Sequence, residues 1–378
     1  MLILVDENIP MGREAFAAHG EVRLFAGRGL TRAQLSDAQA LIVRSVTRVD
    51  AKLLEGTQVR FVGTATIGTD HVDMPWLAER GIGFSSAPGC NANSVGEYVA
   101  SALTGLESRQ GFPLAGKTLG IIGWGHVGKR VEAKAAALGL RILRNDPPLQ
   151  AAAHDARSFS PLERLTVECD ILSLHVPLIT DGSHPTLRLC DAGFFSRLAK
   201  PIVLLNTCRG EVIDETALRT ARRSGKIRHL VLDVFAGEPR PDPATCAAAD
   251  LITPHIAGYS LPGKLNGTTQ VAAAFRRHFG YADAWKPEYP APAEADIAYV
   301  EESDTAFERR CIAAVYDVAA DDARLRAALT ESDPGKGFDR LRREYPIRHE
   351  FGSFQVIRLP EEKRVLRSRL SGLGFRDG

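Results

Sequence analysis

Short apolar runs alternate with helix-like segments along most of this chain of 378 residues. In the first 90 or so residues, the runs expected to form strands are Leu2–Val5, Val22–Phe25, Ala40–Val43, Arg60–Val62 and Ile82–Phe84. The segments expected to form helices between them are Gly12–Ala18, Arg32–Ala38, Asp50–Leu54 and Met74–Glu79. Strands and helices that alternate in this way predict a parallel sheet covered on both faces.

A second strand-and-helix series follows an amphipathic segment in which Val95, Val99, Ala102, Leu103 and Leu106 fall on one helical face. Asn93 or Ser94 is the expected N-cap of that helix. The strands expected after it are Leu119–Ile122, Arg141–Leu143, Ile171–Leu174, Ile202–Leu205, His229–Leu232 and Leu251–Thr253. Six strands are the number in a complete Rossmann domain.

The composition changes after Trp285, where Lys286–Ala293 forms a proline-rich linker. Beyond it we expect helices at Thr305–Val318, Asp321–Leu329 and Phe338–Arg343, a strand at Gly352–Leu359 and a charged last helix. The predicted fold class is therefore α/β. It comprises two doubly wound parallel-sheet domains of the Rossmann or flavodoxin type and a smaller, helix-rich α+β C-terminal domain.

Composition narrows the class of protein. Hydrophobic residues make up 44%, charged residues 25%, and the net charge is +1, so neither a nucleic-acid nor a membrane partner is expected. The N-terminus reads as a buried strand rather than a signal peptide, and no apolar run is long enough to span a bilayer. Six scattered cysteines without a C-x-x-C pair favour neither a disulfide nor a metal site, so a cytoplasmic location is expected.

A glycine-rich loop is the first candidate site. Gly123, Gly125 and Gly128 form G-x-G-x-x-G between an expected strand and an expected helix. In a dinucleotide site these glycines allow a tight turn, close approach to the pyrophosphate and close helix–strand packing. Asp146 follows the loop at about the spacing of a ribose-binding acid. An ordinary turn between strand and helix is the alternative interpretation.

Three polar side chains follow successive expected strands: Arg209, Glu238 and His255. Ligands of open α/β sheets bind outside the carboxyl ends of the strands, so these residues are expected to share one site. Oxidation of a 2-hydroxy acid needs a base, which His255 supplies, a carboxylate to orient it, and an arginine for the substrate carboxylate. Taken singly, each could be a surface or structural residue.

Several motifs make this sequence similar to the D-isomer-specific 2-hydroxyacid dehydrogenases over roughly residues 1–285. The motifs are Pro88-Gly89-x-Asn91-x-x-Ser94-Val95-x-Glu97, the glycine loop, His175-x-Pro177-Leu178, Asn206-Thr207-x-Arg209-Gly210, Asp233-Val234-Phe235-x-x-Glu238-Pro239 and Thr253-Pro254-His255-Ile256-Ala257-Gly258. The resemblance implies NAD as cofactor, with Asp146 on the adenosine ribose, and Arg209, Glu238 and His255 as catalytic residues. The cofactor contacts it implies are Gly123, Gly125, His126, Val127, Gly128, Asp146, His175, Val176, Pro177, Thr207, Cys208, Arg209, Asp233 and Gly258.

The resemblance also implies a split layout. Residues 1–94 and 256–285 would form a substrate-binding lid domain, residues 95–255 the NAD-binding domain, and residues 286–378 a C-terminal dimerisation domain of a homodimer. One departure from the family pattern is the glycine loop, where Trp124 and His126 replace residues that are often smaller or different.

Three features resemble one branch of the family, which acts on a small phosphorylated sugar acid. They are the loop Thr64–Asp73, Tyr259-Ser260, and the tail segment Arg342–Arg348. In this branch Ser45, Thr66 and Tyr259 are implied to bind the substrate phosphate, and Arg44 either adds charge or is structural. Two alternatives stay open: another 2-hydroxyacid dehydrogenase such as a phosphoglycerate dehydrogenase, and a non-enzymatic NAD-sensing corepressor on the same fold.

Overall fold

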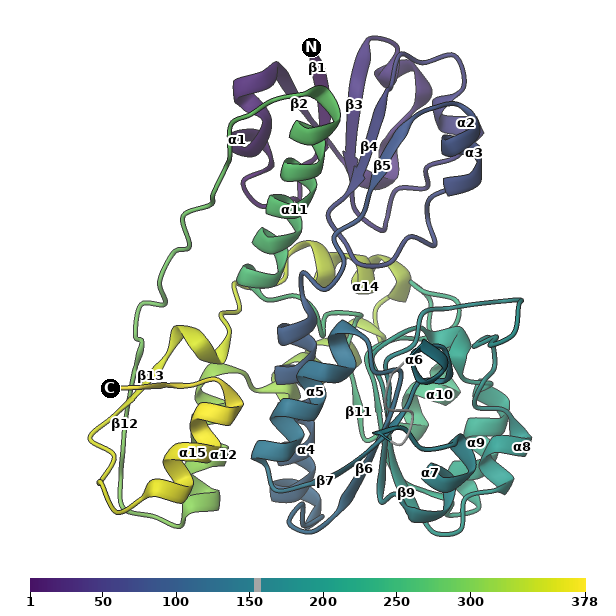
Figure 1. The fold of residues 1–378 in the computed structure, drawn as a ribbon. Coiled ribbons are helices and arrows are strands. Elements are labelled where there is room, and N and C mark those ends of the chain that lie inside the picture. Colours follow the sequence, from purple (N-terminus) through teal and green to yellow (C-terminus); the bar gives the residue numbers. More distant parts are fainter. Residues whose placement is uncertain (153–157) are drawn as a thin grey trace. The chain divides into compact units, whose positions relative to one another are not determined.

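The computed structural model describes residues 1–152 and 158–378. The chain forms two compact units, each assembled from segments that are distant in the sequence (Figure 1). One unit consists of residues 1–91 and 260–290, and the other of residues 92–259 and 291–378.

The first unit is built on a five-stranded parallel sheet with the order β2-β1-β3-β4-β5. Its strands are β1 (Leu2–Asp6), β2 (Glu21–Phe25), β3 (Ala38–Val43), β4 (Phe61–Thr64) and β5 (Gly83–Ser85). Its helices are α1 (Gly12–Phe16), α2 (Ala51–Leu54), α3 (Met74–Glu79) and α11 (Leu261–Phe279), with 3-10 turns at Ala17–His19, Gly27–Gly29 and Arg32–Leu35. One core lies between the sheet and α1 and α11, and a separate core lies under α2 and α3. The sheet is thus covered on both faces, in the strand order of the flavodoxin type.

The second unit contains a six-stranded parallel sheet with the order β11-β10-β9-β8-β6-β7. Its strands are β6 (Thr118–Ile122), β7 (Arg141–Asn145), β8 (Ile171–Leu174), β9 (Ile202–Asn206), β10 (Ile227–Leu232) and β11 (Leu251–Ile252). Its helices are α4 (Ala92–Gln110), α5 (His126–Ala137), α6 (Pro147–Ala152), α7 (Leu162–Glu168), α8 (Ala192–Ser196), α9 (Glu215–Arg223) and α10 (Pro243–Ala248), with a 3-10 turn at Gly210–Val212. Two hydrophobic cores again cover the two faces of this sheet.

The C-terminal segment folds onto the second unit. It contains a small parallel sheet of the order β12-β13-β14. Its elements are β12 (Asp296–Ala298), α12 (Asp304–Val315), α13 (Val318–Ala328), α14 (Pro334–Arg343), a 3-10 turn (Phe351–Ser353), β13 (Gln355–Ile357), α15 (Arg364–Leu373) and β14 (Arg376–Asp377). Phe307, Tyr316 and Leu370 of this segment belong to the same core as Tyr98 and Val131 of the Rossmann part.

The predicted α/β fold class is confirmed, because both larger sheets are parallel and the C-terminal segment is rich in helices. Two predicted elements differ from the structure in type or length. The expected helix Arg32–Ala38 is only a 3-10 turn over Arg32–Leu35, because Ala38 already belongs to β3. The expected strand Gly352–Leu359 is reduced to Gln355–Ile357.

The predicted N-cap of the long helix α4 was also wrong. The helix begins at Ala92, so Asn93 and Ser94 lie inside its first turn. Their side chains bind partners other than the helix N-terminus: Asn93 Nδ2 donates to Glu97 and Glu350, and Ser94 Oγ donates to the carbonyl oxygen of Ala257. Among the helices of the described residues, none combines the length and the apolar character needed to cross a membrane.

Candidate active site

The predicted site residues of the second unit come after the carboxyl ends of its strands. Gly123 follows β6, Asp146 follows β7, His175 follows β8, Arg209 follows β9, Glu238 follows β10, and His255 follows β11. All six strands are parallel, so these ends share one edge of the sheet. This edge is where open α/β sheets bind ligands.

The backbone geometry differs at each of the three glycines of the loop. Gly123 has φ 91°, a conformation that side chains disfavour. A Cβ on Gly128 would lie 2.2 Å from the carbonyl oxygen of Gly123, whereas one on Gly125 would meet nothing within 4 Å. The loop is therefore closed behind Gly128 and open at Gly125, as a pyrophosphate cradle at the N-terminus of α5 requires.

Replacing Gly128 by alanine should weaken NAD binding by at least about tenfold, because the added methyl group displaces the loop from α5. Titration of the protein with NADH, followed by fluorescence, measures the effect. Gly29→Ala is the matched control, because a Cβ there meets nothing within 4 Å. Equal affinities of Gly128→Ala and wild type for NADH would contradict the assignment of this loop.

Asp146 is bound to the glycine loop. Its Oδ2 accepts a hydrogen bond from the Trp124 amide at 2.8 Å, and its Oδ1 accepts one from Leu149 at 3.0 Å. The side chain of Trp124 packs edge-on against Phe159, with the guanidinium of Arg144 4.6 Å from its ring centroid, while His126 is exposed. Trp124 is thus held by ring contacts, and His126 faces solvent.

His255 and Glu238 form a hydrogen-bonded pair. The Nδ1 of His255 lies 2.8 Å from Oε2 of Glu238, and Oε1 of Glu238 accepts the Phe235 amide at 3.0 Å. Burial would raise the pKa of Glu238, but the charge and hydrogen bond of His255, with the charge of Arg342, lower it below its ordinary value. An ionised carboxylate only accepts, so Nδ1 carries the proton toward Glu238, and Nε2 is left to exchange a proton with a substrate.

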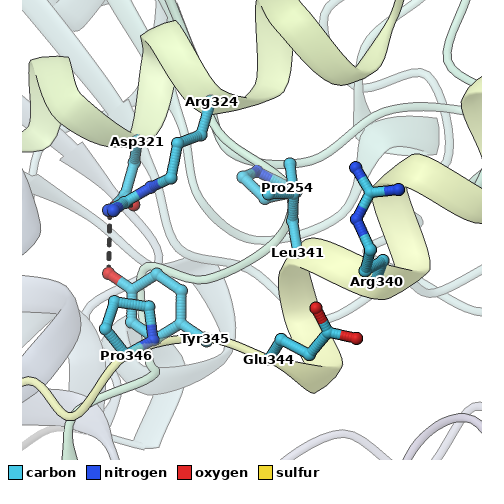
Figure 2. Close-up of a pocket in the computed structure, with 8 residues that line it drawn as sticks. All are labelled: Pro254, Asp321, Arg324, Arg340, Leu341, Glu344, Tyr345 and Pro346. Carbon is cyan, nitrogen blue, oxygen red and sulfur yellow. Dashed lines mark hydrogen bonds and ion pairs between the residues drawn. The ribbon is translucent and has the colours of Figure 1, made fainter. Parts of the chain in front are cut away.

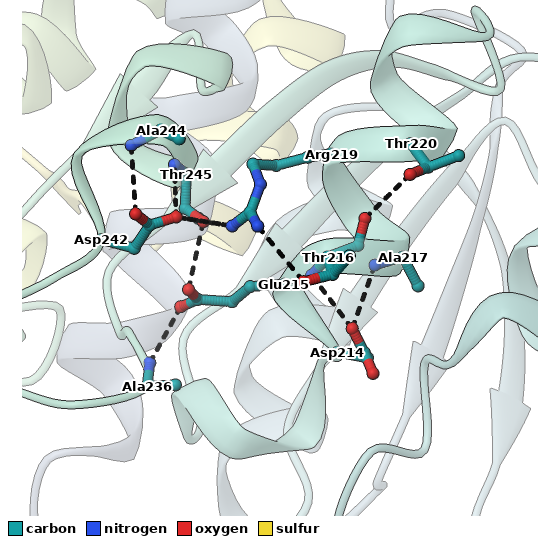
Figure 3. Close-up of polar contacts among 10 residues, drawn as sticks. All are labelled: Asp214, Glu215, Thr216, Ala217, Arg219, Thr220, Ala236, Asp242, Ala244 and Thr245. Atoms are coloured by element: carbon teal, nitrogen blue, oxygen red, sulfur yellow. Dashed lines mark hydrogen bonds and ion pairs between the residues drawn. The ribbon is translucent and has the colours of Figure 1, made fainter.

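A polar network holds the segment that carries Glu238 (Figure 3). Glu215 of α9 accepts the Ala236 amide at 3.0 Å and the Thr245 hydroxyl at 3.1 Å. Arg219, one turn further along α9, donates to Asp242 and to the Thr245 hydroxyl. The position of Glu238 is therefore fixed from the side of α9 and α10.

Asp233 fixes the position of the segment that carries His255. Its two oxygens accept the Thr253 hydroxyl at 2.6 Å and the amides of Ile256 and Ala257 at 2.8 and 2.9 Å. Burial raises its pKa to about 6, although His255 and these hydrogen bonds oppose the rise. The Tyr98 hydroxyl, 2.7 Å from the Thr253 hydroxyl, extends the network to α4. Asp233 is thus an anchor of the His255 segment, and its contact with NAD stays a prediction.

Arg209 lies on a turn that packs tightly against the neighbouring segment. A Cβ on Gly210 would lie 1.9 Å from the carbonyl carbon of Phe235, so the turn packs directly on the Glu238 segment. Asn206 closes the turn by donating to the carbonyl oxygen of Arg209 and accepting the Cys208 amide. The backbone thus keeps the guanidinium at the same sheet edge as Glu238.

His175 is unsuited to acid–base work. Its ring nitrogens lie 2.8 Å from the Ser173 hydroxyl and 3.2 Å from the Thr207 hydroxyl. Desolvation lowers its pKa to about 3, so the ring does not readily take up a proton near pH 7. His255 therefore stays the predicted base.

The predicted phosphate-binding residues are divided between the units. Ser45 follows β3 and Thr66 follows β4, two neighbouring parallel strands of the first unit. The Thr66 hydroxyl lies 2.8 Å from that of Thr64, and Ser45 is exposed beside the half-buried Arg44. Tyr259 belongs to the second unit, where Arg342 donates to its hydroxyl at 3.3 Å.

Four residues that shape this region had no role assigned from the sequence: Tyr98, Thr253, Asn206 and Arg342. Thr253 and Asn206 lie in the motifs quoted above, next to expected buried strands. Their polar side chains at these positions could therefore have indicated a role in the site. Tyr98 was hidden within the apolar face of α4, and Arg342 lies in the tail far from the site in sequence. Arg348 of the tail donates to Ser94 and Ala257 of its own chain.

All six cysteines are buried and free, and no cluster of metal-binding side chains occurs within residues 1–152 and 158–378. Glycines and an acid at the end of a parallel sheet are typical of a dinucleotide site.

Comparison with known proteins agrees with this geometry. The family model "D-isomer specific 2-hydroxyacid dehydrogenase, NAD binding domain" matches residues 95–257, and a domain of unknown function, DUF3410, matches residues 290–373. Among solved structures, a 3-phosphoglycerate dehydrogenase from Entamoeba histolytica with bound NAD+ has a TM-score of 0.63 and 26% identity, over 74% of this chain and 95% of that one. A D-lactate dehydrogenase from Aquifex aeolicus shares the fold, with a TM-score of 0.62 and 23% identity, over 74% of this chain and 96% of that one.

Curated relatives match over nearly the whole length. Erythronate-4-phosphate dehydrogenases from Escherichia fergusonii and Shigella sonnei are each 46% identical over 94% of this chain and 94% of their own. The chain therefore belongs to the D-isomer-specific 2-hydroxyacid dehydrogenases, a family of NAD-dependent oxidoreductases, and within it to the erythronate-4-phosphate dehydrogenase family. The predicted family and its phosphorylated-sugar-acid branch are confirmed.

Proposed function

We propose that this protein oxidises 4-phospho-D-erythronate to 3-hydroxy-2-oxo-4-phosphooxybutanoate with NAD, as a step in pyridoxal 5′-phosphate biosynthesis. The observation that carries the proposal is the His255–Glu238 pair, 2.8 Å apart on the segments that follow neighbouring strands β10 and β11. The 46% identity to erythronate-4-phosphate dehydrogenases selects the substrate.

The residues of this chain suit NAD. The loop of Gly123, Gly125 and Gly128 opens at the N-terminus of α5 and would receive the pyrophosphate, and Asp146 would accept from the adenosine ribose. His126, Val127, His175–Pro177, Thr207–Arg209, Asp233 and Gly258 complete the proposed cofactor contacts. The nicotinamide supplies the chemistry of accepting a hydride.

The protein's own residues perform the other steps. Arg209 binds the substrate carboxylate through its planar guanidinium. His255 takes the proton of the 2-hydroxyl at Nε2, while Glu238 holds the ring and stabilises the imidazolium. The hydrogen on the same carbon leaves with its electron pair, so the C–O single bond becomes a carbonyl group. Ser45, Thr66 and Tyr259 bind the phosphate, and Arg44 adds charge near Ser45.

The quaternary and domain organisation are part of the proposal. Residues 1–94 and 256–285 act as the substrate-binding domain, residues 95–255 bind NAD, and residues 286–378 join two copies into a homodimer. The enzyme works in the cytoplasm on a small phosphorylated sugar acid. The 46% identity to erythronate-4-phosphate dehydrogenases over 94% of the chain, tail included, supports this organisation.

Production of NADH from 4-phosphoerythronate, 3-phosphoglycerate and glycerate, measured side by side, tests the function. Each assay is repeated with a 2-keto acid acceptor, because tightly held NADH would mask turnover. Preference for 4-phosphoerythronate is expected. Preference for 3-phosphoglycerate would indicate a phosphoglycerate dehydrogenase, and NAD binding without turnover of any substrate would favour the NAD-sensing corepressor.

Tyr259→Phe should raise KM for 4-phosphoerythronate by about 10–100-fold, because one hydrogen bond to a charged group is lost. The affinity for NAD should stay at the wild-type value, since the change removes only a hydroxyl group. Steady-state kinetics and an NAD titration on the same preparation give both quantities. If both remain at wild-type values, Tyr259 has no role in binding the phosphate.

A further inference from the structure

Arg342, in the last turn of α14, carries a full charge although it is only 7% exposed. Its Nε donates to the Tyr259 hydroxyl at 3.3 Å, and its guanidinium carbon lies 5.8 Å from the centroid of the Tyr259 ring and 6.0 Å from that of Phe338. Throughout residues 1–152 and 158–378, no carboxylate forms an ion pair with this guanidinium, and the bond to Tyr259 is its one hydrogen bond.

This guanidinium lies near the catalytic pair. Burial would lower the pKa of Arg342, but Tyr259 and the Glu238 carboxylate raise it, and Arg342 in turn helps to lower the pKa of Glu238. Pro254, the residue before His255, lines one pocket together with Leu341, the neighbour of Arg342 on α14 (Figure 2). The C-terminal segment thus places Arg342 beside the segment that carries His255 and Tyr259.

The surroundings of Arg342 differ from those of Arg340 and Arg324. Arg340 on the same helix pairs with Glu331, and Arg324 on α13 pairs with Asp321. A buried guanidinium without an ion-paired carboxylate is costly, and one of its five N–H donors makes a hydrogen bond here. A bound anion would supply an ion-pair partner in addition to the more distant Glu238 and Asp339 charges, and the planar guanidinium matches the oxygens of a phosphate.

We propose that Arg342 binds the phosphate of the substrate together with the Tyr259 hydroxyl, so that the C-terminal domain supplies a specificity-determining residue to the active site of its own chain. This inference rests on the proposed function. Arg209 binds the carboxylate end of the substrate. Arg342 supplies a positive charge for the phosphate end, beside the Tyr259 hydroxyl that is already assigned to the phosphate.

The test compares R342Q and R342K with wild type on 4-phosphoerythronate and on erythronate, which lacks the phosphate. R342Q should raise KM for 4-phosphoerythronate by about 10–100-fold, as expected for the loss of a charge-assisted hydrogen bond, and R342K should fall between R342Q and wild type. Values of kcat/KM for erythronate should be unchanged. The matched control is R343Q on the same helix, because Arg343 is exposed and pairs with Glu344. R343Q should behave as wild type on both substrates.

Two further readouts separate phosphate binding from other roles. Inorganic phosphate should inhibit the wild type competitively and should lose this effect in R342Q. Equal losses on both substrates, or a shifted pH profile of kcat with unchanged phosphate inhibition, would show that Arg342 acts through Glu238 and would overturn the proposal. If wild type oxidises 3-phosphoglycerate instead of 4-phosphoerythronate, the proposed function fails. The phosphate arm, run with 3-phosphoglycerate and glycerate, then still decides the role of Arg342.

Discussion

His255→Gln should lower kcat by about 10²–10⁴-fold, because the 2-hydroxyl proton loses its acceptor in the transition state. The affinity for NAD should be retained, since His255 acts on the substrate and the glycine loop holds the cofactor. Stopped-flow measurement of NADH formation, together with an NADH titration, gives both quantities. Glu238→Gln should show a smaller loss of kcat, because the histidine remains and only its orienting carboxylate at 2.8 Å is neutralised.

The control for this prediction is His184→Gln, which changes an exposed histidine. Its kcat should equal that of wild type. Full turnover in His255→Gln would remove His255 from the mechanism and would mean that another group takes the 2-hydroxyl proton. His175 would be a poor replacement, since desolvation lowers its pKa to about 3.

Arg209→Gln should lower kcat/KM by roughly 10²–10³-fold, mainly through KM, because a bidentate, charge-assisted contact with the substrate carboxylate is lost. Arg209→Lys should recover only part of the loss, since an ammonium group does not reproduce the planar fork. Initial rates over a range of substrate concentrations separate the two parameters.

Arg223→Gln provides the comparison, because Arg223 is exposed at the end of α9 and its side chain contacts Thr220. It should leave both parameters unchanged. A KM for Arg209→Gln at the wild-type value would mean that another cation binds the carboxylate, and Arg342 would then be the first candidate of the second unit.

The site residues that lie in short sequence motifs could be predicted from the sequence. Gly128 is needed because α5 passes close to the Gly123 carbonyl, and Gly210 because its turn touches the Phe235 backbone. Such requirements restrict residue types locally, so they leave a pattern in the sequence. The pairing of His255 with Glu238 was predicted for a related reason, since both residues follow neighbouring parallel strands.

Contacts that join distant segments left no such pattern. Asn93 or Ser94 was the predicted N-cap, but the amide group of Asn93 donates to Glu350, which is 257 residues away. The 3-10 turn at Arg32–Leu35 is short because β3 begins at Ala38 and pairs with β1. In both cases tertiary partners outweighed the local preference of the residue.

The sequence by itself determined the parallel α/β architecture, the glycine loop with Asp146, and the order Arg209, Glu238, His255 along successive strand ends. These follow from hydrophobic periodicity and from the rule that the carboxyl ends of parallel strands meet at one edge. Only the tertiary structure decided that Asp233 uses both oxygens to anchor the His255 segment. It also decided that Arg342 of the tail reaches Tyr259 of the Rossmann part. The reason is physical: a buried carboxylate or guanidinium takes whichever partners packing brings within reach, and packing joins residues that are far apart in the chain.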